Sequence, residues 1–508
     1  MESQIKKIIV IGSGVGGLAT ACLLAKVGHK VTVLEKNNRI GGRASIFETQ
    51  GYTFDMGPSW YMMPDVFAHF FSLLDVDVDE ELTLERLDPS YRIFFESLEQ
   101  PVDIKSDRAY LKQLFESLET GSGTKLDIHL DEGAFQYQTA RQEFMFKNYD
   151  SLFDFFNLKL MKEGSKLPLF STMEKIVNKR FSNAYLQKIL QYQTVLLGTS
   201  PAECPGIYAL MNHIDLDQGI WYPQGGMFAV TAAMERIALS LGVEIRTSTP
   251  VQEIQIENHK TTGVLTESGE QLSADIVVSN ADLTHTDHEL LPEGYSERSV
   301  DYWQKRRMTP SGFILYLGVD GEIDSLTHHN LYFIDDWKKG NHEVFFGDQM
   351  PEHPSYYVCC PSKSDKNIAP AGKENLFVLV PVAPGLEMSN EQLQAYEDLV
   401  IAQISEKMNI PNLNERIEYK RRFTTYDFKK DYNAYKGNAL SGMAHTLMQS
   451  AWFRPNNKHK KIKDLYYVGA GTNPGIGVPT CLISAEMVFK RIQGITTSAP
   501  LESLNQKN

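Results

Sequence analysis

Glycines near the start of the chain have the spacing that binds the diphosphate of a dinucleotide. Gly12, Gly14 and Gly17 form the pattern G-x-G-x-x-G, with Ser13 and Gly16 between them. In this pattern the first glycine permits a tight turn and the second lets a diphosphate approach the backbone. The third lets a following helix pack against the preceding strand. We therefore expect these five residues to contact a dinucleotide.

The flanking sequence supplies the elements that such a loop needs. The apolar run Ile8–Ile11 predicts a buried strand, residues 18–27 predict a helix, and Lys30–Leu34 predict a second strand. The N-terminus of the helix would present free N–H groups and a positive dipole end to the phosphates. Glu35 ends the second strand, 18 residues after Gly17, where an acidic side chain can accept hydrogen bonds from an adenosine ribose.

Two further glycine-containing turns follow this βαβ unit. Lys36 begins the first, which ends in Gly41-Gly42-Arg43, and its glycines allow close approach to a ligand while Arg43 can pair with a phosphate. A plain surface turn is the alternative. A strand through Tyr52 and Phe54 then ends in Met56-Gly57-Pro58-Ser59, a tight backbone element suited to facing a flat ring.

The bulk composition excludes several classes of protein. The 508 residues are 42% hydrophobic and 22% charged, and the net charge of −14 argues against a nucleic-acid partner. The five scattered cysteines fit neither a zinc site nor a redox C-x-x-C motif, so we expect reduced thiols in the cytosol. His285 and His288 form an H-x-x-H in a polar stretch, for which a solvated loop or helix end is favoured over a metal. No metal is predicted.

Apolar runs do not predict a membrane span. Residues 8–25 are uncharged and follow two lysines, as in a signal peptide, but the four glycines within them and Glu35 beyond them favour a folded domain. Apart from this glycine-broken run, no stretch of 18 apolar residues occurs.

The end of the chain repeats the arrangement of strand, glycine-rich loop and helix. Residues 465–480 read LYYVGAGTNPGIGVPT, and a helix is expected over 481–491. Together with G-x-G-x-x-G, G-G-R and the F-D-M-G-P-S of residues 54–59, this segment resembles the FAD-dependent amine-oxidase superfamily. More narrowly, it resembles the bacterial-type phytoene desaturases and dehydrosqualene desaturases. Asn473 departs from that pattern, because histidine is usual there, so a titrating role at this position is in doubt.

The resemblance implies FAD as the cofactor and names the residues that bind it. Those beyond the first loop are Glu35, Lys36, Gly42, Arg43, Gly57, Pro58, Ser59, Val251, Gly471, Gly477, Val478 and Pro479. In this superfamily the valine at the Val251 position contacts the adenine through its backbone.

The fold class expected is α/β, with a doubly wound, Rossmann-like FAD-binding domain that is discontinuous in sequence. Residues 1–75, 221–300 and 440–495 would form it, with an α+β substrate domain from 76–220 and 301–439 and a frayed polar tail at 496–508. Helices are expected at 107–118, 132–156, 173–199, 228–241 and 389–408, the last with a capping box. Strands are expected at 242–246, 251–256, 271–280, 311–317 and 376–382, and solvated surface at 421–429 and 458–463.

One stretch of the expected substrate domain differs in charge from the acidic whole. Residues 151–180 carry six basic and three acidic side chains among many aromatic and aliphatic ones. Such a stretch could lie on an anionic membrane surface, or be a core helix with a solvated lysine face. Asp154, near its start, is a candidate catalytic base, with a solvated helix residue as the alternative.

The function that the resemblance implies is FAD-dependent desaturation of a long, acyclic, apolar polyene precursor such as phytoene or dehydrosqualene. A hydride would pass to the flavin, a proton would leave the neighbouring carbon, and membrane quinone or oxygen would reoxidise the flavin. A cytoplasmic protein attached peripherally to the membrane is expected. Three alternatives remain: a carotenoid oxygenase or ketolase, an amine oxidase with an aromatic cage, and a non-catalytic lipid-binding protein like the Rab escort and dissociation-inhibitor family. The sequence leaves the oligomeric state open.

Overall fold

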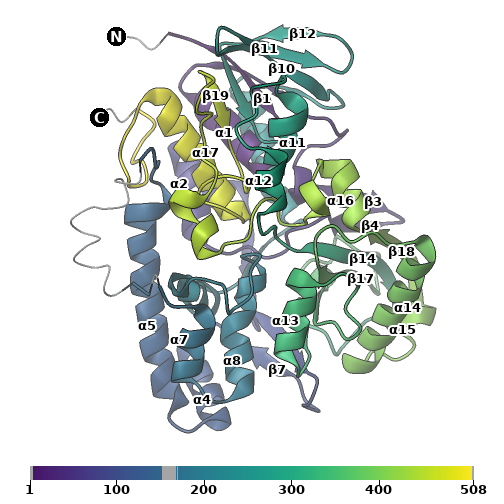
Figure 1. Ribbon diagram of the computed structural model, residues 1–508. Coiled ribbons are helices and arrows are strands. Elements are labelled where there is room, and N and C mark those ends of the chain that lie inside the picture. The colour runs from purple at the N-terminus through teal and green to yellow at the C-terminus, as the bar shows by residue number, and fades with distance from the viewer. Residues whose placement is uncertain (1–3, 152–166, 169, 506–508) are drawn as a thin grey trace.

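A five-stranded parallel sheet carries the N-terminal glycine motif in the computed structural model, which describes residues 4–151, 167–168 and 170–505 (Figure 1). Its strand order is β19-β13-β1-β2-β9, so strands from the two ends and the middle of the chain lie side by side. The strands are β1 (Lys7–Ile11), β2 (Lys30–Leu34), β9 (Glu244–Arg246), β13 (Ile276–Ser279) and β19 (Leu465–Tyr467). The expected doubly wound α/β fold is therefore confirmed.

Helix α1 (Val15–Lys26) packs against both α10 (Phe228–Ser240) and α17 (Val478–Gln493). Every residue of α1 from Val15 to Ala25 is buried, which explains why this helix has no polar face in the sequence. The short α2 (Pro64–Leu73) packs on α17.

A seven-stranded mixed sheet forms the second large layer, in the order β18-β14-β17-β16-β15-β6-β7. Its strands are β6 (Tyr91–Phe95), β7 (Val102–Ile104), β14 (Ser311–Asp320), β15 (His329–Phe333), β16 (Tyr356–Cys359), β17 (Lys373–Val382) and β18 (Ile417–Phe423). Nine of the ten β14 residues are buried. Ile314 and Tyr316 face the main core, and Phe313 and Leu315 face a second core with α14 (Asn390–Lys407). Burial on both faces explains the uninterrupted apolar run.

Helices form the end of the molecule farthest from the three-stranded sheet (lower left in Figure 1). They are α4 (Arg108–Leu118), α5 (Ser122–Ala140) with a π-helical end at Arg141–Met145, α7 (Met173–Arg180), α8 (Ala184–Gln191) and α9 (Leu210–His213). Smaller elements are the hairpin β3 (Ile46–Thr49) and β4 (Tyr52–Asp55), the pair β5 (Leu84–Arg86) and β8 (Trp221–Pro223), and the three-stranded sheet β10 (Val251–Glu257), β11 (Lys260–Thr266) and β12 (Gln271–Ser273). The remaining helices are α3 (Val78–Glu81), α11 (Leu283–His285), α12 (Val300–Gln304), α13 (Trp337–Phe346), α15 (Leu413–Arg416) and α16 (Thr425–Tyr432).

Most elements lie where the sequence predicts them, including the capping box that Ser389 and Gln392 form at the start of α14. Two long elements were predicted wrongly. Residues 173–199 form two helices because Asn183 caps a new helix, its Oδ1 accepting hydrogen bonds from the N–H groups of Tyr185 and Leu186. Residues 271–280 form two strands in different sheets, because the Asp275 N–H pairs with the Lys7 carbonyl.

Three other predictions need correction. The helix expected at 132–156 begins at Ser122 and ends at Met145, residues 146–151 are not helical, and 152–156 lie outside the described residues. Residues 421–429 are not solvated surface, because Phe423 and Phe428 are buried at 1% and 3% exposure. The tail is not frayed up to residue 505, because Leu501 and Leu504 pack into the main core. At 458–463, all four lysines are exposed as expected. Within the described residues, no helix has the length and apolarity to cross a membrane.

Candidate active site

A cavity of about 1450 Å³ joins the glycine-rich loops of the five-stranded sheet to one face of the seven-stranded sheet. Most residues predicted to bind the cofactor line it: Gly12, Gly14, Gly16, Glu35, Lys36, Gly42, Arg43, Gly57, Pro58, Ser59, Val251, Gly471, Gly477, Val478 and Pro479. Ser13 and Gly17 do not line the cavity and lie behind its wall. Asp154 lies outside the described residues.

The first glycine loop leaves room for a diphosphate. Helix α1 starts after Gly14, and no side chain caps its first turn, so its N–H groups face the cavity end of the loop. A Cβ on Gly14 would lie 2.8 Å from Oδ1 of Asn280, whereas a Cβ on Gly17 would lie 2.1 Å from the Gly12 carbonyl oxygen. Gly14 therefore leaves space for the Asn280 side chain at the cavity wall, and Gly17 is required by the helix–strand contact.

Glu35 is held in place from behind. Its Oε2 accepts hydrogen bonds from the N–H and the hydroxyl of Ser13, at 2.8 and 2.7 Å, and its Oε1 accepts one from the Asn37 N–H at 2.9 Å. These three bonds fix a buried carboxylate at the cavity wall, and the lone pairs that remain can accept hydrogen bonds from a ribose.

The second turn packs directly on the first, since Gly41 forms a β-bridge with Gly14. Arg43 follows this turn, and its guanidinium donates from Nε to the Ala439 carbonyl at 2.8 Å and from Nη2 to the Asn438 carbonyl at 3.3 Å. Burial lowers the pKa of Arg43, and the nearby Asp282 carboxylate opposes that shift. Arg43 thus brings a buried positive charge to the cavity and ties the turn to the chain at 438–439.

Lys36 does not point freely toward a ligand. Its Nζ donates to the Lys430 carbonyl at 2.8 Å and to Oδ1 of Asn433 at 2.9 Å. Lys36 therefore joins the end of β2 to the end of α16. It lines the cavity with atoms other than this ammonium group.

The C-terminal glycine loop is clamped by a buried arginine that the sequence analysis missed. The Arg454 guanidinium donates to the carbonyls of Thr472, Ala470, Met443 and Gln449, at 2.8–3.2 Å. Burial lowers its pKa to about 10. Nε2 of the buried His445 accepts the Ile476 N–H at 3.2 Å on the same loop. The loop is thereby fixed ahead of α17, whose N-terminus at Val478 also opens to the cavity.

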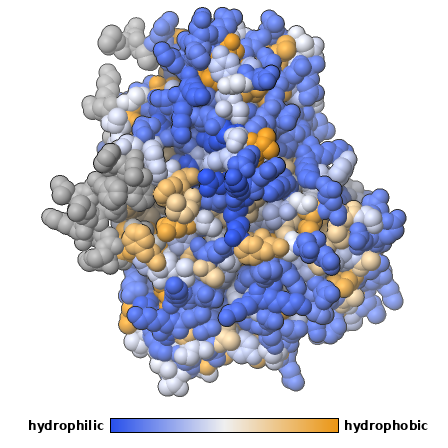
Figure 2. Space-filling model, in the orientation of Figure 1, coloured by the Kyte–Doolittle hydropathy of each residue, from blue (hydrophilic) through white to orange (hydrophobic). Residues whose placement is uncertain are grey.

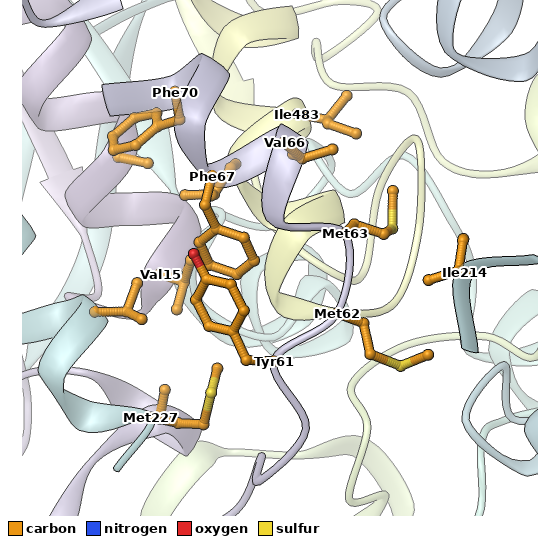
Figure 3. Packing of buried hydrophobic residues seen from close by; sticks show 14 of the residues in the cluster. Val15, Tyr61, Met62, Met63, Val66, Phe67, Phe70, Ile214, Met227 and Ile483 are labelled. Carbon is orange, nitrogen blue, oxygen red and sulfur yellow. The ribbon is translucent and has the colours of Figure 1, made fainter. Parts of the chain in front are cut away.

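The rest of the cavity is apolar. Met62 and Met63, just before α2, and Ile214 line this part. Figure 3 shows the two methionines on the segment that leads into α2, with Ile214 across from them. Leu331, Phe333 and Phe377 of the seven-stranded sheet line the opposite part, and Trp60, Tyr192 and Tyr357 add aromatic rings. Among the described lining residues, the acidic groups all belong to the nucleotide end: Glu35, Glu267, Asp282, Glu289 and Asp431. The wide part therefore suits a hydrocarbon.

A buried acid lies behind this apolar wall. Asp215 Oδ2 accepts hydrogen bonds from the hydroxyls of Tyr91 and Tyr192, at 2.9 and 3.0 Å, and from Gln193 Nε2 at 2.6 Å. Burial raises the pKa of Asp215 to about 6, and the three hydrogen bonds oppose the shift. Asp215 thus holds the Tyr192 ring in the cavity wall without entering the cavity.

The H-x-x-H lies at a helix end, one of the two placements expected, but it is not fully solvated. His285 ends α11 and His288 lies in the π-helical turn that follows, and both are half-buried around the fully buried Asp287. His285 lines the nucleotide end of the cavity. All five cysteines are free thiols, and four are buried, as predicted.

Asn280 is the nucleotide-side residue that the sequence analysis overlooked. It follows β13, donates from Nδ2 to the Val468 carbonyl at 3.0 Å, and fills the space beside Gly14, Gly16 and Gly17. A polar residue at the carboxyl end of a parallel strand is the signal that could have identified it.

These residues fit a dinucleotide cofactor that carries a flat ring. The diphosphate position is bounded by two uncapped helix N-termini and a buried arginine, and the cavity continues from there past Gly57–Ser59 into the apolar part. A bound FAD supplies a ring that accepts a hydride from an unactivated carbon, which side chains alone cannot do.

Comparisons with known proteins agree with this geometry. Residues 15–492 match the family of flavin-containing amine oxidoreductases. The chain is 42% identical to a carotenoid 3,4-desaturase of Haloarcula japonica, over 94% of this chain and 96% of that protein. It is 35% identical to a zeta-carotene-forming phytoene desaturase of Myxococcus xanthus, over 98% and 97%. The solved structure of an oxidoreductase from Methanosarcina mazei has the same fold, with a TM-score of 0.62 and 18% identity, over 95% of this chain and 100% of that chain. The chain therefore belongs to the flavin-containing amine oxidoreductase family as an FAD-dependent oxidoreductase, and its resemblance to the carotenoid desaturases is confirmed.

Proposed function

We propose that this protein desaturates a long, acyclic polyene, with FAD as the hydride acceptor. The observation that carries the proposal is the continuous cavity, whose nucleotide end is polar and whose other part is walled by apolar and aromatic side chains. A hydrocarbon has no group to bind by hydrogen bonds, so such walls are what would hold it against the ring. The names of the relatives, a carotenoid 3,4-desaturase and a phytoene desaturase, support the same substrate class.

The cofactor would be held at both glycine loops. Gly12, Gly14 and Gly16 would accommodate the diphosphate, Glu35 the ribose, and the Val251 backbone the adenine. Gly42 and Arg43 would approach the phosphates, while Gly57–Ser59 and Gly471–Pro479 would lie along the ring. In this division the five-stranded sheet belongs to the FAD-binding domain, and the seven-stranded sheet with the helices of 108–213 belongs to the substrate domain.

The mouth of the cavity supports peripheral attachment to a membrane, where such a substrate dissolves. Phe170, Leu447, Met448 and Phe453 line the cavity and are exposed by 93%, 43%, 58% and 45%. We call these four residues the apolar rim. Apolar side chains gather left of centre, at mid-height, on the face shown in Figure 2. A rim of this kind would sit in the lipid surface and let the substrate, and a quinone, enter from it.

The rival functions make different demands on the same cavity. An oxygenase would use the same cavity but place oxygen in the product. Trp60, Tyr192 and Tyr357 would also suit the cation of an amine substrate, so amines belong among the test substrates. A non-catalytic lipid carrier would not need the flavin.

The test is incubation of the FAD-loaded protein with liposomes that contain phytoene, a partly desaturated carotene, or dehydrosqualene, with a quinone as acceptor. Desaturation lowers the product mass by two hydrogens per step and reddens its absorbance, and the best substrate decides between the C40 and C30 series. Label from ¹⁸O₂ in the polyene without a gain in conjugation would refute the proposal in favour of an oxygenase. Oxidation of amines alone would favour the amine oxidase.

A further inference from the structure

Ser59, Tyr357 and His329 form a hydrogen-bonded chain that leads out of the cavity. The Tyr357 hydroxyl lies 2.8 Å from Ser59 Oγ and 2.6 Å from His329 Nδ1. Ser59 and Tyr357 line the cavity, whereas His329 lies behind them with no exposed surface. The His329 ring stacks on Trp60, which also lines the cavity, with centroids 4.5 Å apart and planes 8° from parallel. The three polar groups thus run from the cavity wall into the protein.

The protonation state of His329 limits the possible directions of these hydrogen bonds. Burial, with the neighbouring His328, moves the pKa of His329 well below its usual value, so the imidazole is neutral. A neutral imidazole accepts at one nitrogen, and the relay proposed below uses the tautomer in which Nδ1 accepts from the Tyr357 hydroxyl, which the ¹⁵N measurement tests. Ser59 can then donate to Tyr357, which leaves one lone pair of the Tyr357 oxygen unused. His329 Nε2, which then carries the proton, has no hydrogen-bond partner among the described residues.

The apolar part of the cavity has no carboxylate, because those among the described lining residues lie at the nucleotide end. His445, which also lines the cavity, has both ring nitrogens in hydrogen bonds, with the Tyr208 hydroxyl at Nδ1 and with the Ile476 N–H at Nε2. A carbon chain that has given up a hydride becomes a strongly acidic cation, so its neighbouring C–H can be deprotonated by a neutral base. The faces of Trp60 and Tyr192 in the same wall would stabilise the positive charge while it lasts.

We propose that Tyr357 is the catalytic residue that takes the proton from the substrate, and that His329 is the positioning residue that receives the hydroxyl proton of Tyr357. This inference rests on the desaturation proposed above. One C–H bond breaks as a hydride that the oxidised flavin accepts, and the neighbouring C–H bond breaks as a proton that forms a bond to the Tyr357 oxygen. The original Tyr357 proton moves to His329 Nδ1, and the carbon–carbon double bond forms. When a quinone takes the hydride back from the flavin, the stored proton returns through Tyr357 and completes the quinol.

A metal site is the competing explanation of the same residues. Possible ligand atoms of His328, His329 and Cys359 lie within 4.8 Å of one another. The Tyr357 hydroxyl contacts the Nδ1 atom of His329 that lies 3.7 Å from the Cys359 sulfur, whereas Nε2 of His328 and of His329 has no hydrogen-bond partner among the described residues. A metal on either nitrogen of His329 excludes the relay, because a metal at Nε2 requires the ring proton to be at Nδ1. Metal analysis of the purified protein therefore distinguishes the two explanations.

Tyr357→Phe is the decisive variant, and Tyr332→Phe is its matched control. Tyr332 lies on the neighbouring strand β15, is buried, stacks on Tyr356, belongs to the second core on the other face of the sheet, and does not line the cavity. Both variants keep the ring and lose the hydroxyl. FAD content and substrate affinity should stay within about twofold of wild type in both, because neither is an interaction of that hydroxyl.

The single-turnover rate of product formation should fall roughly 100-fold or more in Tyr357→Phe and stay unchanged in Tyr332→Phe. Because the cation then survives longer, part of the product should be an alcohol labelled from H₂¹⁸O. In histidine-labelled protein, the ¹⁵N signal of His329 Nδ1 should be that of an unprotonated acceptor and should move only in Tyr357→Phe. A desaturating wild type with an equally fast Tyr357→Phe variant, or one bound metal per chain, overturns the proposal. A wild type that desaturates no polyene overturns the proposed function itself, and the relay with it.

Discussion

Ser13 donates two hydrogen bonds to one oxygen of Glu35, from its backbone N–H at 2.8 Å and from its hydroxyl at 2.7 Å. The first glycine loop and Glu35 are therefore one rigid unit, although 22 residues separate Ser13 from Glu35. A shift of either group would move the other, so the contacts to the diphosphate and to the ribose of a bound ADP moiety would change together.

We expect Ser13→Ala to weaken FAD binding about tenfold, although Ser13 does not line the cavity. A hydrogen bond to a charged acceptor contributes about 1.5 kcal/mol or more, close to the free energy of a tenfold change in Kd. Titration of the apoprotein with FAD, followed by quenching of flavin fluorescence, measures the effect. Ser72→Ala is the control, because this exposed hydroxyl bonds only to the His69 carbonyl. An unchanged Kd in Ser13→Ala would mean that Glu35 is held well enough by its other bonds.

Gly14 and Gly17 should respond differently to added side chains. Gly14→Val should purify as a folded protein without FAD, because the nearest obstacle is the Asn280 side chain and the ligand space is filled instead. Gly17→Ala should lower the melting temperature or prevent folding, because its Cβ would meet the Gly12 carbonyl oxygen at 2.1 Å. Flavin absorbance and circular dichroism separate the outcomes. A yellow Gly14→Val protein would place the diphosphate elsewhere.

Replacing the apolar rim with serine should release the protein from vesicles. Phe170→Ser, Met448→Ser and Phe453→Ser together remove the most exposed apolar side chains of the rim. Flotation with anionic liposomes should show less bound protein, and Leu239→Ser, an exposed leucine of α10 away from the rim, should not.

The basic stretch of 151–180 makes a separate electrostatic prediction. Reversing Lys159, Lys162 and Lys166, which lie outside the described residues, should weaken binding, and so should salt, because screening shortens to about 8 Å at physiological ionic strength. If neither salt nor these reversals nor the rim variant alters flotation, the membrane proposal fails.

The buried Asp215 should make stability depend on pH. Its pKa is raised to about 6 from 3.8, so the folded state holds this proton more tightly than the unfolded chain does. The resulting stabilisation is full below about pH 4 and is lost as the pH rises through 6, by about 3 kcal/mol. Asp215→Asn, which cannot titrate, should therefore lose stability relative to wild type at pH 4 more than at pH 7. Urea unfolding of the holoprotein at both pH values measures the difference.

Asp217 provides a control of opposite sign. Burial acts to raise its pKa, but Arg108 and His213 outweigh burial and lower it. Its contribution is present at neutral pH and lost as the pH falls, so Asp217→Asn should cost more stability at pH 7 than at low pH. Two variants with the same pH trend would contradict the assignment.

Asn473→His should leave activity near wild type at pH 8, where an imidazole is mostly neutral. Asn473 is buried and lines the cavity, and its carbonyl accepts a hydrogen bond from Asn457 Nδ2 at 3.1 Å, which a histidine would preserve. A loss above about 100-fold, roughly 2.7 kcal/mol of barrier, would mean that the amide has a specific role.

The nucleotide end could be predicted from the sequence because it depends on local backbone geometry. A glycine loop between a strand and a helix has few possible shapes, so Gly12, Gly14 and Glu35 were found by spacing alone. The other half of the site depends on contacts between distant segments. Tyr357 and Ser59 meet across 298 residues, and Arg454 reaches its loop from a segment with no regular pattern. Tyrosine and arginine are common everywhere, so no spacing distinguishes those that close a cavity.

The same limit explains the misassigned elements. The break at Asn183 is a side-chain cap within an otherwise helical apolar pattern, which periodicity does not detect. The division of 271–280 into two strands depends on where Lys7 pairs, and the ordered tail depends on the Leu501 N–H reaching Glu486 Oε1 at 2.8 Å. In these last two cases, partners far away in the chain decide the structure.

The order β19-β13-β1-β2-β9 also has a consequence for biosynthesis. Strand β1 is made first, but its neighbour β13 and the outer strand β19 come from residues 276–279 and 465–467. At about 5–20 residues per second, the ribosome needs on the order of half a minute or more to complete the set. During that time α1, apolar on every side, lacks α17 as its cover. The nascent chain therefore exposes the apolar surface of α1 until α17 has been made, and the cavity wall at 471–479 is completed only then.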